Sequence, residues 1–448
     1  MLRIRRIDWS DSNAAGELDS LREILSIETG QVTEQSLKRT IEVFGEPLSP
    51  LSVVRRILDE VRLRGDAAVV KYSEKLDGVR LRPDEFAVDP AALKAAYDRV
   101  EPEFREAIDV ARKNIEEFQR HVLATAPEPL VRGGARLETR YRPLRRVGVY
   151  VPGGAAPYPS AVLMDVIPAQ VAGCKEIAVA TAPRHLNDYV MAALHLLGVK
   201  EVYRVGGAQG IGMLAYGTET VEKVDMIVGA GNVFVSLAKR EVFGIVKVDM
   251  FAGPSEVLVI ADETADADYV AADMLSQAEH YPGSAILVTN SEKVSAAVEA
   301  ALERQLKDMP RGPMCLECLE KYGAIVHVTS LDEAVTVANR VAPEHLEIIT
   351  ADPRSLAAKI DNAGTVFLGA NTPEPVGDYL AGSSHTLPTG GTARFFSGLS
   401  ALDFIKRLTF IEYSREALKS ELQYVTTIAR REGLEAHARA AEWRFKKG

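Results

Sequence analysis

Two polar side chains near the end of an expected helix, Gln277 and His280, are three residues apart and so project from one helical face. An amide oxygen and an imidazole nitrogen on one face can bind the same divalent cation. Two buried polar residues that bond only to other protein groups would show the same spacing. Because Asp273 and Glu279 are also close in sequence, the spacing alone leaves both interpretations open.

A second constellation is the adjacent pair Glu344 and His345. A carboxylate beside an imidazole is a natural acid/base pair near neutral pH. Pro343 disfavours helical backbone at Ala342, so we expect the pair to open a strand or a loop. On a regular strand the two side chains would point to opposite faces, so they share a site only if the backbone is irregular.

Three further polar residues lie toward the end of the chain. Asp378 and His385 are in a segment rich in glycine and proline, and His437 is among charged helical residues. Polar side chains in an ordered loop are candidates for a site, but Asp378 could equally cap a short helix. The surroundings of His437 favour a solvated side chain.

Two glycine-rich turns, at residues 206–210 and 229–232, follow apolar runs, but neither fits the G-x-G-x-x-G dinucleotide pattern. Their backbone amides could still bind a phosphate at the start of a helix. Cys315 and Cys318 have the spacing of half a zinc site, and Cys174 is the only other thiol. We therefore interpret the cysteines as structural.

The elements that must position these residues form two series of short β-branched runs that alternate with helical segments. Such alternation indicates βαβ units and mostly parallel sheets, with ligands at the carboxyl ends of strands, where these glycine turns fall. The strands are expected at residues 147–151, 177–180, 202–205 and 226–228, and at 257–260, 285–288, 325–328, 347–349 and 366–368.

The sequence therefore predicts an α/β fold of two Rossmann-like lobes with mostly parallel sheets, plus helical N-terminal and C-terminal extensions. The predicted domains are an N-terminal helical extension (1–45), a discontinuous first lobe (46–137 and 255–399), a second lobe (138–254) and a helical C-terminal tail (400–448).

Composition narrows the class of protein. The 448 residues are 47% hydrophobic and 26% charged, which is typical of a globular enzyme. The net charge of −10 argues against a nucleic-acid partner. No apolar run reaches the ~18 residues that span a bilayer, and the N-terminus does not resemble a secretory signal. With only three cysteines, we expect a reduced, cytoplasmic protein without membrane contact.

Seven short segments in order resemble the histidinol dehydrogenase family, and the resemblance runs from about residue 50 to the C-terminal helices. They are Val149-Tyr150-Val151-Pro152-Gly153-Gly154, Gly206-Gly207-Ala208-Gln209, Ala252-Gly253-Pro254-Ser255-Glu256, Leu275-Ser276-Gln277-Ala278-Glu279-His280, Ala342-Pro343-Glu344-His345-Leu346, Leu387-Pro388-Thr389 after Gly377-Asp378, and Glu432-Gly433-Leu434-Glu435-Ala436-His437.

The resemblance implies one Zn²⁺ per subunit, two NAD⁺ per turnover and a homodimer with shared active sites, in which the C-terminal tail reaches the partner subunit. The metal ligands would be Gln277, His280, Asp378 and His437. The catalytic residues would be Glu344, which activates water, and His345, the base. The first lobe would carry most of these residues and the second would contact NAD⁺ through Tyr150, Gln209 and Asn232. The substrate-binding residues would be Ser255, Gln277, His280, His345, Asp378, Glu432 and His437.

The implied reaction is the zinc-dependent, two-step, four-electron oxidation of L-histidinol to L-histidine through the aldehyde, the last step of histidine biosynthesis. Ala230, Ser384 and a shortened segment at 281–284 depart from the family pattern. These departures keep open a paralogous dehydrogenase that acts on another small alcohol, such as a sulfonated diol. A non-catalytic dimer with structural zinc is the alternative from another class.

Overall fold

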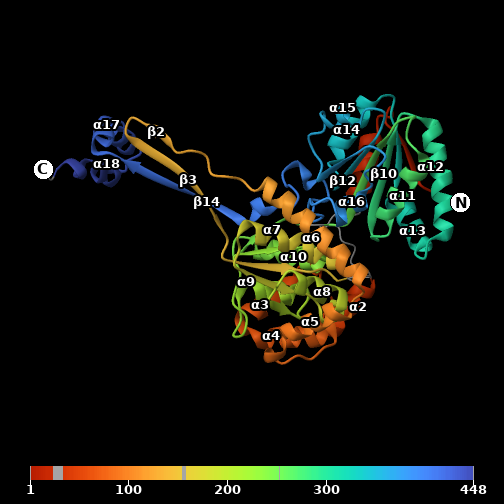
Figure 1. Ribbon diagram of the computed structural model, residues 1–448, viewed down its shortest axis with the longest axis horizontal. Coiled ribbons are helices and arrows are strands. Elements are labelled where there is room, and N and C mark those ends of the chain that lie inside the picture. The colour runs from red at the N-terminus through yellow and green to blue at the C-terminus, as the bar shows by residue number, and fades with distance from the viewer. Residues whose placement is uncertain (1, 24–33, 154–157, 252, 447–448) are drawn as a thin grey trace. The chain divides into compact units, whose positions relative to one another are not determined.

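The computed structural model describes residues 2–23, 34–153, 158–251 and 253–446 (Figure 1). Gly154 and Ala252, which belong to two of the segments quoted above, lie outside these ranges. The chain divides into two compact units, one of residues 1–122 and 144–404 and the other of residues 123–143 and 405–448. Each is described by itself.

One of the two sheets of the first unit has six parallel strands. Nearly every residue of its central strands is buried, which explains their uninterrupted apolar runs. In spatial order the strands are β1 (Arg5–Asp8), β11 (Ala324–His327), β10 (Gly283–Thr289), β9 (Ser255–Ala261), β12 (His345–Ile349) and β13 (Thr365–Leu368).

Helices cover both faces of this sheet because alternate side chains of each strand enter two separate cores. Val257 and Val259 pack on one face and Leu258 and Ile260 on the other. One face is covered by α11 (Ala267–Ala278), α12 (Glu292–Gln305) and α13 (Gly312–Tyr322), and the other by α1 (Ala14–Glu23), α14 (Leu331–Val341) and α15 (Pro353–Ala357). The short helix α16 (Glu374–Tyr379) follows β13.

The other sheet of the first unit has five parallel strands. Its strands, in spatial order, are β6 (Glu201–Tyr203), β5 (Glu176–Ala180), β4 (Arg146–Tyr150), β7 (Met226–Val228) and β8 (Lys247–Val248). The connecting helices are α7 (Pro159–Ala172), α8 (Asp188–Leu196), α9 (Gly207–Tyr216) and α10 (Val233–Val242). The predicted α/β class with two mainly parallel sheets is confirmed.

The N-terminal helices correct one predicted boundary. The sequence placed residues 46–137 in the first lobe with 255–399, but α3 (Pro50–Arg64) and α4 (Asp66–Tyr72) share a core with the five-stranded sheet and α9. The apolar stripe of α3 predicts a buried face but not the sheet that it covers. The helix α3 starts where Ser49-Pro50 indicates it. Ser49 is the N-cap residue and its side chain accepts the N–H of Ser52, and Pro50 is the first residue of the helix.

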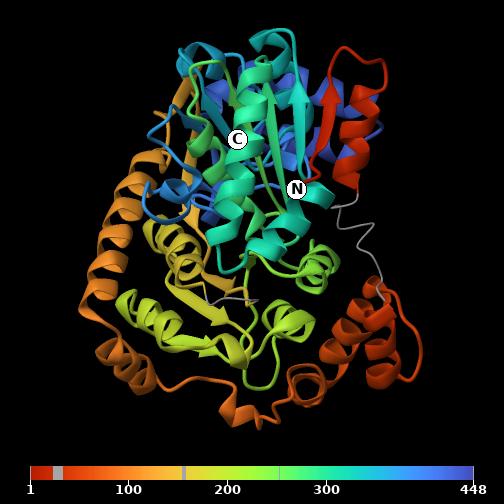
Figure 2. The ribbon, with the colours of Figure 1, turned by 90° about the vertical axis from the view of Figure 1, so that its right-hand side faces the viewer.

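The first 45 residues include a strand as well as helices. Arg5–Asp8 forms β1, the edge strand that pairs with β11, and Figure 2 shows β1 and α1 in red beside the sheet. Four residues with one buried side chain, Ile7, carry too short a pattern to indicate a strand. The remaining helices are α2 (Glu34–Phe44), α5 (Pro90–Arg99) and α6 (Pro102–Val122).

The second unit corrects the expectation that residues 400–448 are entirely helical. It contains an antiparallel sheet of β14 (Ile405–Tyr413), β3 (Ala135–Pro143) and β2 (Leu130–Arg132), and the helices α17 (Arg415–Arg431) and α18 (Glu435–Glu442). The pairing runs from Ile405 opposite Pro143 to Tyr413 opposite Ala135, so β14 depends on a partner far away in sequence. Because charged residues occupy exposed positions of β14, its sequence lacks the apolar pattern that would indicate a strand.

Short helical turns complete the description: Ser73–Asp77, Pro83–Glu85, Pro183–His185, Leu306–Asp308, Thr392–Arg394, Ala401–Phe404 and Trp443–Phe445. Among the residues described, no helix combines the length and hydrophobicity needed to cross a bilayer.

Candidate active site

The adjacent residues Glu344 and His345 reach one site because the backbone before them is irregular. Helix α14 ends at Ala342, which has left-handed backbone angles (φ 49°, ψ 60°), and Pro343 follows. Strand β12 begins only at His345. The Glu344 Oε2 atom consequently lies 3.7 Å from the His345 Nδ1 atom, which meets the condition set by the sequence.

Glu344 is held by two donors from the start of β9. Its Oε2 atom accepts hydrogen bonds from the Ser255 hydroxyl at 2.5 Å and from the Glu256 N–H at 2.9 Å. Burial raises the pKa of Glu344 to about 7, even though His345 and these donors favour the charged form. A carboxyl group with such a pKa can both accept and release a proton near neutral pH.

The two ring nitrogens of His345 have different surroundings. Nδ1 lies 3.2 Å from the Glu256 carbonyl oxygen and 3.5 Å from a Glu374 oxygen, so it faces acceptors and carries a proton. Nε2 has no hydrogen-bond partner among the described residues and lies 3.6 Å from an Asp378 oxygen. Burial alone lowers the pKa of His345, but Glu344, Glu374 and Asp378 outweigh it and raise the pKa to about 10. When the ring is neutral, the proton stays on Nδ1, which faces the acceptors, and the lone pair is on Nε2.

Next to His345, the side chains of His280, Glu374 and Asp378 place potential ligand atoms within 4.8 Å of one another. Gln277 is fully buried, yet neither its side-chain oxygen nor its nitrogen has a partner among the described residues. Neither side-chain oxygen of Glu374 has a hydrogen-bond partner among the described residues. Buried polar atoms without partners and an excess of carboxylates fit a bound cation. Nitrogen and oxygen donors without a thiolate suit zinc in a catalytic site.

Glycine allows the backbone to come close to two of these residues. A Cβ atom at Gly283 would lie 2.9 Å from the Gln277 carbonyl oxygen and 3.2 Å from its side-chain nitrogen. A Cβ atom at Gly377 would lie 2.6 Å from the ring of Phe367, so α16 approaches β13 closely just before Asp378. The positions of Gln277 and Asp378 therefore depend on these two glycines.

A cavity of about 350 Å³ lies at the amino ends of β9 and β12. Its lining includes the predicted residues Ser255, His280, Glu344, His345, Asp378 and Asn232. Ser384, a departure from the family pattern, is buried and is not among the described residues that line this cavity. Its hydroxyl accepts the Thr386 N–H at 3.0 Å. Ala230 does line it.

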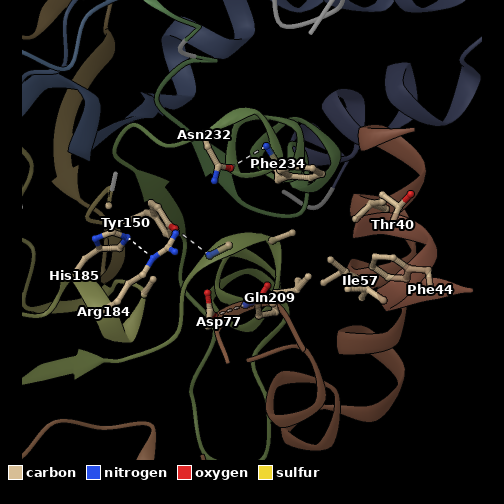
Figure 3. A pocket seen from close by; sticks show the side chains of 17 residues that line it. Thr40, Phe44, Ile57, Asp77, Tyr150, Arg184, His185, Gln209, Asn232 and Phe234 are labelled. Carbon is tan, nitrogen blue, oxygen red and sulfur yellow. Dashed lines mark hydrogen bonds between the residues drawn. The ribbon is translucent and has the colours of Figure 1, made fainter. Parts of the chain in front are cut away.

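The three predicted NAD⁺ residues line a second cavity of about 260 Å³ (Figure 3). Tyr150 is the last residue of β4, and its hydroxyl accepts the Gly207 N–H at 3.0 Å. Asn232 caps α10 by accepting the N–H groups of Phe234 and Val235. Both positions are at carboxyl ends of parallel strands, where Rossmann-like sheets bind nucleotides.

Gln209, in the first turns of α9, is fully buried beside this cavity. Its Nε2 atom donates to Asp77 at 3.0 Å, which leaves its Oε1 atom without a partner among the described residues (Figure 3). Gly153 and Asn232 line both cavities, so the two spaces adjoin. Such a pair of spaces suits an extended ligand.

Glu432 and His437 lie in the second unit, where both are exposed. Glu432 follows α17 as its C-cap residue, and His437 is in α18. Cys315 and Cys318 are residues of α13, and both side chains are buried in the core between this helix and the six-stranded sheet, as expected of structural cysteines.

Sequence reasoning missed Glu374 and Asp77. Glu374 precedes Asp378 by one helical turn, a spacing that could have indicated a shared face. The neighbouring Pro373, Pro375 and Gly377 favoured a loop instead. Nothing in the local sequence indicates that Asp77 faces Gln209, since the two belong to separate segments brought together by the fold.

Comparisons with known proteins agree with this geometry. A family model described as histidinol dehydrogenase matches residues 48–445. The histidinol dehydrogenase of Rhodopirellula baltica is 47% identical over 436 residues, which cover 97% of this chain and 95% of that protein. That of Geobacillus kaustophilus is 50% identical over 417 residues, covering 92% and 97%.

Among solved structures, histidinol dehydrogenase from Elizabethkingia anophelis superposes with a TM-score of 0.89 at 33% identity, over 100% of this chain and 99% of that one. Agreement in sequence and fold over nearly the full length leaves one conclusion. The chain belongs to the histidinol dehydrogenase family and is an oxidoreductase.

Proposed function

We propose that this enzyme oxidises L-histidinol to L-histidine in two steps, through the aldehyde, and reduces two NAD⁺ as the last step of histidine biosynthesis. The observation that carries the proposal is the paired Glu344 and His345 side chains next to the cluster of His280, Glu374 and Asp378. This arrangement supplies a proton acceptor and a cation site to one cavity.

The metal would be held by Gln277, His280 and Asp378 of one subunit. We assign the fourth ligand, His437, to the tail of the partner subunit in a homodimer, together with the substrate contact Glu432. When bound, zinc would supply Lewis-acid polarisation and a fixed point for the nitrogen atoms of the substrate. Its positive charge would also offset the carboxylates that surround His345.

In the first step, Nε2 of His345 takes the proton of the substrate hydroxyl while the carbon that bears this hydroxyl loses a hydride to NAD⁺. The products of this step are the aldehyde and NADH. Nε2 is suited to this role because Nδ1 already faces the Glu256 carbonyl and two carboxylates. The ring therefore cannot turn its other nitrogen to the substrate without losing these contacts.

In the second step, Glu344 takes a proton from the water that adds to the aldehyde. The resulting hydrate anion loses a hydride to the second NAD⁺, and the carboxylic acid that forms releases its remaining proton to become the carboxylate of histidine. Ser255 and the Glu256 N–H support this role, because they fix one Glu344 oxygen at the cavity wall. A buried site also limits escape of the reactive aldehyde.

The dinucleotide would lie along the two adjoining cavities, with Tyr150, Gln209 and Asn232 as its contacts. Asn232 and Gly153 line both spaces, which supports one ligand that extends from one to the other. The other domain boundaries and the cytoplasmic location remain predictions from the sequence.

The deciding experiment measures NADH formed per molecule of L-histidinol consumed by zinc-loaded enzyme at mildly alkaline pH. We expect a ratio of two with histidine as the product. A ratio of one would contradict the role of Glu344 in the second step. No NADH with histidinol, but NADH with a sulfonated diol, would favour the paralogous dehydrogenase. No NADH with any alcohol, together with loss of dimer on chelation, would indicate structural zinc.

A further inference from the structure

The turn at residues 229–232 leads from β7 into α10 and borders both cavities. Ala230 and Gly231 line the cavity that also holds His345, and Asn232 lines both spaces. Asn232 is in addition the N-cap residue of α10 (Figure 3). The conformation of this turn therefore decides where Asn232 lies between the two spaces.

Gly229 begins the turn in a backbone conformation that favours glycine, with φ at 107°. A Cβ atom there would lie 2.1 Å from the Tyr150 carbonyl oxygen, so the turn is packed against the end of the neighbouring strand. Strand β7 ends at Val228. The N–H and the carbonyl of Gly229 consequently lie beyond the strand and need other partners.

A buried pair of opposite charges binds both of these backbone groups. Asp249 follows β8, and its Oδ2 atom accepts the Gly229 N–H at 2.8 Å. Lys239 lies in α10, and its ammonium group donates to the Gly229 carbonyl at 2.7 Å. The Lys239 and Asp249 side chains form an ion pair and are only 2% and 1% exposed. Two separate elements therefore hold one glycine residue.

Further hydrogen bonds leave this pair little freedom. The Oδ1 atom of Asp249 accepts the Met250 N–H at 2.7 Å, so both carboxylate oxygens are bonded. Lys239 lies two helical turns after Asn232, so α10 holds the turn at both ends, through its cap and through its lysine. Apolar residues can often replace a buried ion pair without loss of stability. The hydrogen bonds to Gly229 are what apolar side chains could not supply.

We propose that the Lys239–Asp249 ion pair positions the turn at residues 229–232, and through it Asn232, for binding of the dinucleotide. Neither charged side chain is among the described residues that line the cavities, so the pair acts through the turn. The inference rests on the proposed placement of NAD⁺ along the two cavities. It adds a role for two residues that lie outside them.

The test measures the Kd for NADH by fluorescence, and the KM for NAD⁺ and kcat, with zinc-loaded, full-length variants. Lys239→Met removes the donor to the Gly229 carbonyl. We expect Kd and KM to rise by about 10- to 100-fold, the size of a lost hydrogen bond to a charged group. We expect kcat and zinc affinity to stay within about threefold of wild type, because the proposed base and metal ligands lie on other elements.

A double variant separates positioning from stability. In Lys239→Met the Asp249 carboxylate is buried without its cation, which lowers the melting temperature. Adding Asp249→Asn removes this charge, so the double variant should melt above Lys239→Met. The Gly229 carbonyl still lacks its donor, and the Kd for NADH should stay raised. Recovery of wild-type NADH affinity in the double variant would show that the pair serves stability alone. Where Lys239→Met does not fold, the double variant carries the test.

Arg146 provides the matched control. It is also a buried cation of the five-stranded sheet, 2% exposed, and donates to Glu201 at 2.7 and 2.6 Å. It begins β4, at the end of the strand opposite Tyr150. We expect Arg146→Met to lower the melting temperature without changing the Kd for NADH. If Lys239→Met and Arg146→Met have the same NADH affinity, the inference is wrong.

A separate variant distinguishes failure of this inference from failure of the proposed NAD⁺ site. Gln209→Ala removes a proposed contact with the dinucleotide and should weaken NADH binding. If Gln209→Ala binds NADH as wild type does, the proposed placement fails and this inference fails with it. If Gln209→Ala loses affinity while Lys239→Met and the double variant keep it, only the positioning role fails.

Discussion

At the scale of single residues, the orientation of one imidazole ring supports the proposed role of His345 as the base. His345 Nδ1 faces a carbonyl and carboxylates, whereas Nε2 has no hydrogen-bond partner within the described chain. We expect His345→Asn to lower kcat by about 10²- to 10⁴-fold, the usual contribution of a general base. Zinc content should stay at wild-type level because His345 is not a proposed ligand. Unchanged kcat, measured as NADH production, would remove His345 from the role of base.

Another prediction concerns Asp165, a buried carboxyl group in α7 that accepts the Thr386 hydroxyl at 2.7 Å. Burial raises its pKa from 3.8 to about 7. The folded protein therefore keeps a proton that the unfolded chain releases, and stability is lost as pH rises through this interval. Asp165→Asn cannot ionise and keeps an acceptor for Thr386.

The free energy of unfolding of Asp165→Asn, relative to wild type, should therefore increase between pH 5 and pH 8 by on the order of 1–4 kcal/mol. Urea unfolding at the two pH values measures it. Asp262→Asn is the control, because hydrogen bonds from Thr264 and Ala351 outweigh burial and lower the pKa of Asp262. This group is ionised in both the folded and the unfolded chain above pH 5, so its difference from wild type should not change between pH 5 and pH 8. A pH-independent difference for Asp165→Asn would show that this carboxyl group ionises normally.

At the scale of elements, the close approach of α16 to β13 positions Asp378. Because a Cβ atom at Gly377 would meet the Phe367 ring at 2.6 Å, Gly377→Ala must push the helix away from the sheet. We expect zinc affinity to fall by about tenfold or more. Gly16→Ala in α1 is the control, since its nearest neighbour is a flexible Asn13 oxygen at 3.1 Å and alanine favours helix. Equal zinc affinity of the two variants would contradict this account.

Elements with a strong local signal were predictable, and elements made by distant partners were not. The apolar runs of β9 and β10 indicate buried strands, and Ser49-Pro50 and Asp89-Pro90 indicate the starts of α3 and α5, where the Ser49 and Asp89 side chains cap the helices. Strand β14 is exposed along its length and exists because it pairs with β3. The spacing of Gln277 and His280 indicated a metal site but could not exclude a structural pair. The left-handed backbone at Ala342 decided what the Glu344–His345 sequence left open.

At the scale of the whole molecule, the proposed dimer predicts complementation between two inactive variants. If His437 serves the partner's site, a His345→Asn subunit and a His437→Ala subunit together form one intact site per mixed dimer. Random reassociation of equal amounts should restore about a quarter of wild-type activity, because half of the dimers are mixed and each has one working site. Activity is measured after joint refolding or coexpression. A mixture as inactive as its components would place the complete site within one subunit.

The two α/β lobes were predictable because each strand and helix carries its own periodicity. Which segments of the chain belong to which lobe was not predictable. Residues 50–72 carry an apolar stripe that would suit either sheet, and only the shape of the core selects the five-stranded one. Assignment of a helix to a layer is thus a property of packing between distant segments.

The shared wall between the two cavities has a thermodynamic consequence. Asn232 and Gly153 belong to both, so a ligand that shifts either residue changes the binding free energy of a ligand in the other space. Linkage requires this coupling to be reciprocal: the factor by which the dinucleotide changes affinity for the alcohol equals the factor by which the alcohol changes affinity for the dinucleotide. An inhibitor that fills only one cavity would then have a potency that depends on the concentration of the other ligand.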